Sequence, residues 1–365
     1  MEIRKIQSTA SGSFFITLPK NWVMELNIKK GDEIAISYID DEALKVHPLK
    51  KQENYLSEFY IQIEEYAENN SLERSVYSSY VQGADVIVIS SKNTIMVENK
   101  RLIKNCTLDL IGAEISEEFS NRITIRILVD PVKFPLHHLV KRIYTLVSSM
   151  HIDAIKAFQN NDQILAQDVI NREKEVYKLY YLMLRQLNLS LSNKINIEEI
   201  CMSDIKIDCI LGIVLARDLS KMAHYAIEIA KETLKLNDKD INIEIKEHLV
   251  QMSHFIIKMQ QNAILAFFKN DFMRANKIIN NYDAVKEFDR KTENEVWKKI
   301  KDISTIISLI TISKSLRYIA NSSVEVSEDL QAKHRPKITL KKEFGSETTA
   351  DAFELIASLG YKEKK

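Results

Sequence analysis

Residues 11–22 read Ser-Gly-Ser-Phe-Phe-Ile-Thr-Leu-Pro-Lys-Asn-Trp, and this stretch is the most informative part of the chain. Gly12 is a turn residue, and after it Phe14, Ile16 and Leu18 recur at the two-residue period of a strand. Pro19 has no backbone N–H to give to a sheet, so the strand ends there and a short helical pattern follows. The stretch therefore predicts a turn, a strand and a short helix.

The residues that follow predict a second hairpin. Lys29-Lys30-Gly31-Asp32 forms a turn, and Asp40-Asp41-Glu42 forms another. Between the turns, Ile34, Ile36 and Tyr38 share one face of a strand, and residues 43–47 form the closing strand. A segment this small cannot bury enough apolar surface by itself. We therefore expect its apolar faces to need a partner.

Residues 1–50 resemble the AbrB/SpoVT (swapped-hairpin) DNA-binding domain, through the string Gly-Ser-x-x-Ile-x-Leu-Pro-Lys and the later Gly-Asp-x-Ile. The resemblance implies that two chains interleave their hairpins into one shared small β-barrel, and hence a homodimer. It also implies DNA as a partner. A generic β-hairpin module without a role on DNA is the alternative.

The candidate phosphate contacts on DNA are the basic residues of this segment: Arg4, Lys5, Lys20, Lys29 and Lys30. The segment departs from the resembled domain, because many such domains have an arginine after the turn glycine and two arginines in the short helix. Ser13 and the pair Val23-Met24 stand there instead. A role in dimerisation only is therefore a second interpretation.

The charge balance of the chain excludes binding to nucleic acid or membranes through overall positive charge. The 365 residues include 51 basic and 51 acidic ones, so a DNA site must be a local patch. Seven glycines and five prolines are few for this length, which favours long helices. The three cysteines, Cys106, Cys201 and Cys209, indicate reduced thiols in a cytoplasmic protein. We expect neither a signal segment nor a membrane span.

Residues 54–131 predict a small α+β connector domain. Helical patterns cover 71–82 and 97–111, each followed by glycine, and strand patterns cover 85–90 and 122–129 around the segment 114–118. No glycine-rich phosphate loop and no nucleophile beside a base occur in this sequence. Its chemistry cannot be predicted.

From residue 136 to residue 330 apolar residues recur at helical spacing, and the pattern repeats. Met150, Ala154, Phe158, Asn161 and Asp162 recur 109 residues later as Met259, Ala263, Phe267, Asn270 and Asp271. Each repeat predicts three long helices, over 136–161, 162–189 and 204–236 and then over 244–270, 271–301 and 302–330. Asp162 and Asp271 are predicted N-caps of the second helices.

Two tandem three-helix units, 136–236 and 244–330, resemble the PhoU family of phosphate-uptake regulators. Both units begin with a Met-x-x-x-Ala-x-x-Ala-Phe helix and have an Asn-Asp helix start. The order of hairpin, connector and two units is similar to archaeal PhoU-type regulators that carry their own DNA-binding domain. The expected fold is multidomain and mainly α: an N-terminal swapped-hairpin β-barrel, an α+β connector and two three-helix bundles.

PhoU proteins carry paired carboxylates on the third helix of each unit, and these bind metal clusters. The matching positions here are Ser220, Lys221 and His224 in the first unit and Arg317, Tyr318 and Asn321 in the second. Asp218, Glu228 and Glu325 lie nearby but do not restore the acidic pairs. We therefore expect no metal and no other cofactor.

The sequence thus predicts a non-enzymatic, cytoplasmic, homodimeric transcriptional regulator of phosphate homeostasis. The alternative is a PhoU-like adaptor that docks on phosphate transporter subunits or their signalling partner, with the hairpins used only for dimerisation. Residues 331–365 form a tail with the basic run Lys333-His334-Arg335-Pro336-Lys337, followed by Lys341-Lys342 and a possible short helix over 350–359. We expect this tail to be solvated, and a nucleic-acid-binding arm is its second interpretation.

Overall fold

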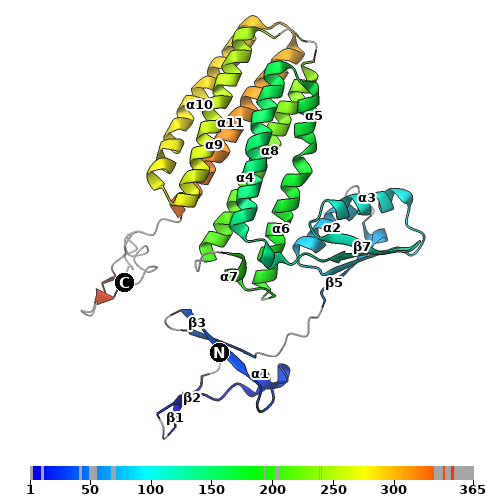
Figure 1. The fold of residues 1–365 in the computed structure, drawn as a ribbon, viewed down its shortest axis with the longest axis vertical. Coiled ribbons are helices and arrows are strands. Elements are labelled where there is room, and N and C mark those ends of the chain that lie inside the picture. Colours follow the sequence, from blue (N-terminus) through cyan, green and yellow to red (C-terminus); the bar gives the residue numbers. More distant parts are fainter. Residues whose placement is uncertain are drawn as a thin grey trace, which may run out of the picture. The chain divides into compact units, whose positions relative to one another are not determined.

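The structure is a computed structural model, and the chain divides into two compact units, Met1–Leu56 and Ser57–Lys365 (Figure 1). It describes residues 3–9, 12–40, 43–48, 56–66, 71–192, 194–201, 206–237, 239, 241–332, 340–341 and 347–348. In the tail the described residues form only the short strands β9 (Leu340–Lys341) and β10 (Glu347–Thr348), which pair with each other. The basic run 333–337 and the expected helix over 350–359 lie outside the described residues.

The N-terminal unit contains two hairpins with a short helix between them. The first pairs β1 (Gln7–Ser8) with β2 (Phe14–Phe15), the helix is α1 (Lys20–Glu25), and the second pairs β3 (Ile34–Asp40) with β4 (Ala43–Pro48). Gly12 and Gly31 adopt left-handed backbone angles, with φ of +88° and +97°, at the two predicted turns. The first strand is shorter than predicted, because no described strand of the same copy pairs with residues 16–18.

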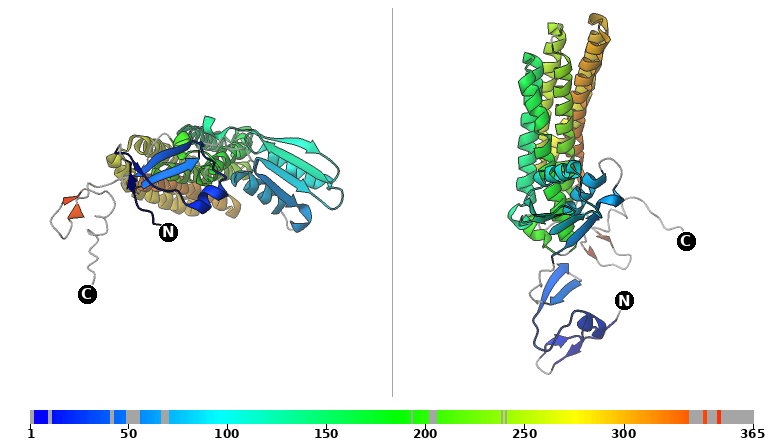
Figure 2. Two further views of the ribbon diagram at one scale, coloured as in Figure 1. Left: turned by 90° about the horizontal axis from the view of Figure 1, so that it is seen from below. Right: turned by 90° about the vertical axis from the view of Figure 1, so that its right-hand side faces the viewer.

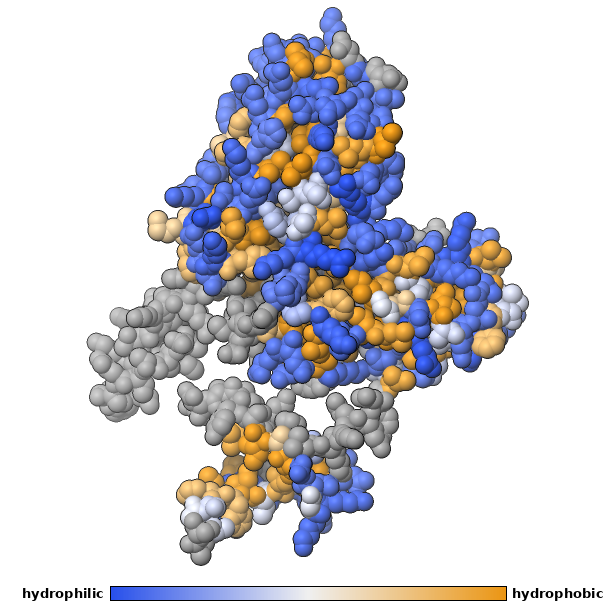
Figure 3. Space-filling model, in the orientation of Figure 1, coloured by the Kyte–Doolittle hydropathy of each residue, from blue (hydrophilic) through white to orange (hydrophobic). Residues whose placement is uncertain are grey.

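The described side chains of the N-terminal unit form no buried core. No side chain that the structure describes between residues 3 and 48 is buried. Phe14 is 78% exposed, Ile16 54% and Ile36 64%. Figure 3 shows hydrophobic surface on one side of this unit.

The α+β domain follows, with a four-stranded sheet in the order β5-β6-β8-β7. Its strands are β5 (Glu58–Gln62), β6 (Val86–Ser90), β7 (Ala113–Glu118) and β8 (Arg122–Ile127), and only β5 and β6 are parallel. The helices α2 (Ser71–Val81) and α3 (Val97–Leu108) cover one face, where Val76, Tyr80 and Ile103 pack on the sheet's buried isoleucines. The turn η1 (Ile63–Glu65) follows β5, and η2 (Pro131–Lys133) leads into the helical region.

The helical region contains long helices that lie side by side around one continuous core (Figures 1 and 2). The first three-helix unit comprises α4 (Leu136–Asn160), α5 (Gln163–Asn171) with α6 (Glu173–Leu191), and α8 (Lys206–Lys235), with the short α7 (Ile197–Ile200) before α8. The second comprises α9 (Ile243–Lys269), α10 (Phe272–Lys299) and α11 (Ile303–Ala332). Helix α8 packs against α4 and α11, so the two units share their interior.

The second helix of the first unit is interrupted, whereas the sequence predicts one helix over 162–189. At Arg172 the backbone N–H donates to the carbonyl of Val169, which is the tighter i→i+3 pattern. The Arg172 guanidinium reaches back to Asp153 on α4, at 2.6 Å, and also pairs with Asp168. These contacts accompany the break between α5 and α6.

The internal repeat is confirmed at the turns. Asn161 and Asn270 both adopt left-handed angles, with φ of 53° and 51°. The Asp162 carboxylate then accepts the N–H of Leu165 at 2.9 Å, and the Asp271 carboxylate accepts the N–H of Arg274 at 3.0 Å. Both aspartates are N-caps, as predicted.

The helical core contains one polar network at equivalent positions of the repeats. His151 on α4 and Gln260 on α9 are 109 residues apart, and His151 Nδ1 lies 2.7 Å from Gln260 Oε1. Ser253 Oγ lies 3.0 Å from His151 Nε2. All three side chains are buried. The two units therefore meet through corresponding residues, as an internal two-fold arrangement requires.

The α+β domain is attached to the first helical unit through a buried arginine. Arg185 on α6 is 2% exposed, and its Nη1 donates to the carbonyls of Tyr80, at 2.9 Å, and Ala84, at 2.7 Å. Its Nη2 lies 3.4 Å from Asp85, and its guanidinium stacks on the Tyr80 ring. Gln186 donates to the carbonyl of Phe134. Within the second compact unit, domain and helices are thus joined by specific polar contacts.

The cysteines correct one expectation. Cys201 and Cys209, predicted as reduced thiols, form a disulfide with a Cα–Cα distance of 5.7 Å. Both are buried; Cys201 follows α7 and Cys209 lies in the first turn of α8. Cys106 is free and buried, and burial raises the pKa of its thiol to about 11.

One described helix, α11, is long and apolar enough to cross a membrane by length and composition. More than half of its apolar window is buried inside the helical region, as is usual for a core helix of a bundle.

Candidate functional sites

The five basic residues predicted to contact DNA are all exposed. Arg4 and Lys5 precede β1, Lys20 begins α1, and Lys29 and Lys30 lie in the turn before β3. That turn is fixed by Asp32, whose carboxylate accepts the backbone N–H of Lys29 at 2.7 Å. The lysine side chains of the turn are therefore available to an anionic partner.

The positions that match the PhoU acidic motif lie on α8 and α11 and carry a lysine between carboxylates. Lys221 Nζ lies 2.9 Å from Asp218 and 3.0 Å from Glu325, so it bridges the two units. Asn321 donates to Glu325 at 3.0 Å. The Lys221 ammonium thus lies between the two carboxylates and compensates part of their charge.

The remaining matching positions are also engaged in packing. Tyr318 stacks on Tyr225 with 4.8 Å between the ring centroids. Arg317 pairs with the buried Asp289 at 2.9 Å, and Asp289 also accepts the hydroxyl of Ser313 at 2.7 Å. Ser220 donates to the carbonyl of Ala216, inside its own helix. His224 is exposed beside Tyr225.

A carboxyl pair that the sequence did not single out lies beside Lys221. Asp329, one turn after Glu325 on α11, faces Asp218 on α8, and its Oδ2 is buried without a hydrogen-bond partner among the described residues. Burial, followed by the charge of Asp218, raises the pKa of Asp329 to about 6. Burial also raises the pKa of Asp218. The i,i+4 spacing of Glu325 and Asp329 places both carboxylates on one face of α11, but no sequence signal points to Asp218 as the neighbour of Asp329.

These residues do not fit a metal cluster. The described residues contain no group of three or more His, Cys, Asp or Glu side chains placed to hold a metal ion. At the motif positions the donor set is a lysine, an arginine, a tyrosine, a histidine, a serine and an asparagine, and the nearby carboxylates already pair with Lys221. Glu228 pairs with Lys231 at 2.8 Å and does not join them.

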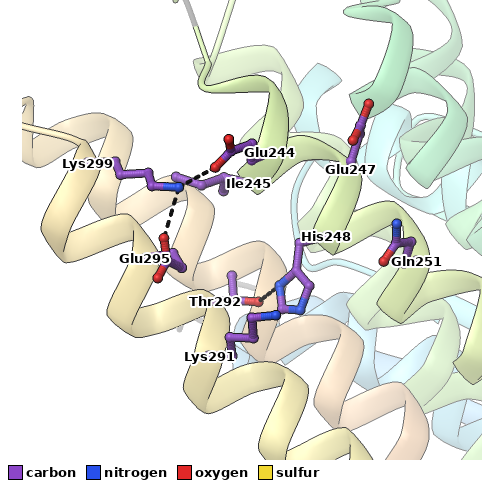
Figure 4. Close-up of a pocket in the computed structure, with 9 residues that line it drawn as sticks. All are labelled: Glu244, Ile245, Glu247, His248, Gln251, Lys291, Thr292, Glu295 and Lys299. Carbon is purple, nitrogen blue, oxygen red and sulfur yellow. Dashed lines mark hydrogen bonds and ion pairs between the residues drawn. The ribbon is translucent and has the colours of Figure 1, made fainter.

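A polar cleft of about 200 Å³ lies between the first turns of α9 and the last turns of α10 (Figure 4). Lys299 lies between Glu244 and Glu295 there. The Thr292 hydroxyl donates to the carbonyl of Phe288, so it accepts from His248 Nδ1, 2.9 Å away. Burial, and then the charge of Lys291, lowers the pKa of His248. The threonine hydroxyl is committed to its helix, so the cleft presents no activated nucleophile.

The matches to known proteins agree with this architecture. Residues 140–233 and 249–330 match the PhoU domain family. Residues 7–54 match the family described as "Antidote-toxin recognition MazE, bacterial antitoxin".

Among curated proteins the chain is similar to the "Phosphate-specific transport system accessory protein PhoU homolog 1" of Thermotoga maritima. The two are 23% identical over 219 residues, which cover 56% of this chain and 89% of the relative. Among solved structures it is similar to PhoU from Pseudomonas aeruginosa, with 16% identity and a TM-score of 0.46 over 53% of this chain and 93% of that one. The phosphate transport system regulatory protein PhoU from Streptococcus pneumoniae gives 20% identity and a TM-score of 0.46, with 53% and 92% covered. The chain therefore carries two stretches that match the PhoU domain family and, before them, one that matches the MazE family.

Proposed function

We propose that this protein is a homodimeric, non-enzymatic regulator of phosphate uptake that binds promoter DNA through its N-terminal unit. In this proposal the protein acts in the cytoplasm, and the PhoU domains receive the signal or contact a partner. Support comes from the two domain matches and from the name of the Thermotoga maritima relative, an accessory protein of phosphate-specific transport.

The observation that carries the proposal is the missing core of the N-terminal unit. A unit with two hairpins, no buried side chain among its described residues and several large exposed apolar residues is not stable as a single copy. A second copy supplies the same apolar surface, and an isologous pairing covers both. Such a dimer presents two sets of the exposed Arg4, Lys5, Lys20, Lys29 and Lys30, as binding to a two-fold DNA site requires.

The first prediction is that the protein is a dimer at micromolar concentration and becomes a monomer in the variant Phe14→Glu with Ile16→Glu. Two carboxylates on this surface make its burial against a second copy unfavourable. Sedimentation equilibrium measures both states. Ile164→Glu is the matched control, because Ile164 is 85% exposed on α5 and should not change the mass. A folded wild-type monomer would remove the swapped-hairpin interpretation.

The second prediction concerns DNA. Replacing Arg4, Lys5 and Lys20 together with alanine should weaken binding to every promoter fragment. The slope of the logarithm of affinity against the logarithm of salt concentration should fall by about three, one for each lost phosphate contact. Fluorescence anisotropy across a salt series measures this. The control replaces Lys258, Lys269 and Lys298, which are exposed on the helical region, with alanine and should leave binding unchanged.

The same assay separates the two roles proposed for the protein. If only deletion of residues 331–365 abolishes binding, the DNA site lies in the tail and not in the N-terminal unit. If no form binds promoter DNA, the adaptor function is favoured, with phosphate transporter subunits as the partner that the relative's name suggests.

A further inference from the structure

The two edge strands of the α+β sheet differ in how well they are protected. Strand β7 has a bulge between Ile115 and Glu117, and it carries Glu114, Glu117 and Glu118. Bulges and charges of this kind keep a sheet edge from pairing with another chain. Strand β5 has neither a bulge, a proline nor a lysine, and its register with β6 is regular from Glu58 to Gln62. Strand β5 is therefore the open edge.

The backbone of β5 offers hydrogen-bonding groups on its outer side. The carbonyl of Ser57 accepts the N–H of Val86 on β6, at 3.1 Å. Because backbone groups alternate along a strand, those of Glu58, Tyr60 and Gln62 point away from β6. No strand among the described residues pairs with that side. The backbone groups of these three residues can therefore form ladder hydrogen bonds with an added strand.

The sequence of β5 is complementary to itself when it runs antiparallel about Tyr60. That register places Glu58 opposite the partner's Gln62, and the Gln62 amide has a second N–H besides the one it donates to Glu64. On the helix-covered face it places Phe59 opposite the partner's Ile61, which joins two apolar residues. On the open face the two tyrosines meet, and Tyr60 is 71% exposed in one copy. Such cross-strand pairs are what stabilise sheets.

We propose that β5 pairs with β5 of a second copy of this chain around a two-fold axis at Tyr60, so that the two four-stranded sheets become one. This inference rests on the proposed dimer of the N-terminal unit. Nine residues, 49–57, join β4 to β5 and span at most about 30 Å. Dimerised N-terminal units therefore hold two β5 edges at a local concentration on the order of millimolar.

The test is a register-specific cross-link in the full chain. The Tyr60 residues would form a hydrogen-bonded antiparallel pair with Cα atoms about 5.5 Å apart, within the range for a disulfide. Tyr60→Cys should therefore form a covalent dimer under mild oxidation, roughly ten-fold more than Glu58→Cys or Gln62→Cys alone. A mixture of the Glu58→Cys and Gln62→Cys chains should cross-link as Tyr60→Cys does. Wild type and Glu114→Cys, on the protected edge β7, are the controls.

The outcomes distinguish this pairing from the proposed function. Cross-linking of Tyr60→Cys and of the mixed chains, with little in the single Glu58 and Gln62 variants, establishes the register. Equal cross-linking at all positions, or none while sedimentation shows a dimer, overturns the β5 pairing and leaves the N-terminal dimer intact. Cross-linking that falls at least ten-fold in the Phe14→Glu, Ile16→Glu background shows that the N-terminal dimer holds the two β5 strands together. Cross-linking that persists in that background shows that β5 pairs without the N-terminal dimer.

Discussion

Arg185→Ala should lower the free energy of unfolding by about 3–5 kcal/mol, because truncation removes a buried guanidinium that donates to two backbone carbonyls. The Ala84 carbonyl loses the donor it has at 2.7 Å, the Tyr80 carbonyl keeps the N–H of Gly83 at 3.0 Å, and the Tyr80 ring loses the stacked guanidinium. Asp85 is less affected, since it keeps the backbone N–H of Ser57 at 2.9 Å. The cost therefore lies mainly with the Ala84 carbonyl and the cavity.

The measurement is thermal unfolding followed by circular dichroism, where this loss corresponds to a midpoint about 6–10 °C lower. Arg185→Met keeps much of the side-chain volume without the hydrogen bonds, so it separates packing from polar contacts and should fall between wild type and alanine. Arg290→Ala is the control, because Arg290 pairs with Glu287 on the exposed face of α10. An alanine variant at position 185 that unfolds with wild type would show that the α+β domain is held by apolar contacts alone.

The helix boundaries could be predicted from local chemistry, and the sites only in part. Asn161 with Asp162, and Asn270 with Asp271, are a C-cap followed by an N-cap, and such signals depend on neighbours in sequence. Gly83, with positive φ, closely follows the end of α2 as predicted, whereas α3 ends at Leu108 and not at residue 111 before Gly112. Strand β5 could not be predicted, because only Ile61 of its five residues is fully buried and the apolar pattern is weak.

The candidate site could not be predicted from the sequence, because its contacts depend on how helices distant in sequence pack together. The sequence showed that acidic pairs are missing at the motif positions, but it did not show that Lys221 reaches Glu325 on another helix. It also could not show that Asp218 and Asp329 share a contact across α8 and α11. Likewise, Arg185 reads as an ordinary helix arginine until the α+β domain covers it. Which faces of helices meet is a tertiary property, and one sequence with helical periodicity is compatible with several arrangements.

The buried His151 should make the stability of the helical region depend on pH. Burial, opposed by the hydrogen bond to Gln260, lowers the pKa of His151 to about 4. In the unfolded chain a histidine titrates near pH 6.5. Between these values the unfolded state binds a proton that the folded state does not, so stability falls as pH falls through this window. The full effect between pH 6.5 and pH 4 is about 3 kcal/mol.

The hydrogen bonds around His151 also determine its protonation state in the folded protein. Gln260 Nε2 donates to the sulfur of Met222, so its Oε1 accepts from Nδ1, and the ring is neutral with the Ser253 hydroxyl at Nε2. His254 on α9 adds a smaller electrostatic contribution of the same sign. A protonated ring would make Nε2 a donor, so the Ser253 hydroxyl would have to turn and accept from it. Burial of the resulting charge is the main cost, so we expect acid to weaken the contact at which the two helical units meet.

His151→Gln should remove this dependence, since position 151 then holds the residue that the second repeat has at position 260. We expect the variant to be near wild type or less stable at pH 7 and more stable than wild type at pH 4.5, measured by urea unfolding at both values.

Asp329→Asn tests a pH dependence of stability of the opposite sign. The raised pKa of Asp329 means that the folded state holds a proton up to about pH 6, so its contribution is present at low pH and lost as pH rises through 6. Asn at 329 should therefore stabilise the protein at pH 7 more than at pH 4.5. If His151→Gln and wild type respond to pH in parallel, His151 is not neutral in the folded state, and the contact between the two units does not sense acid.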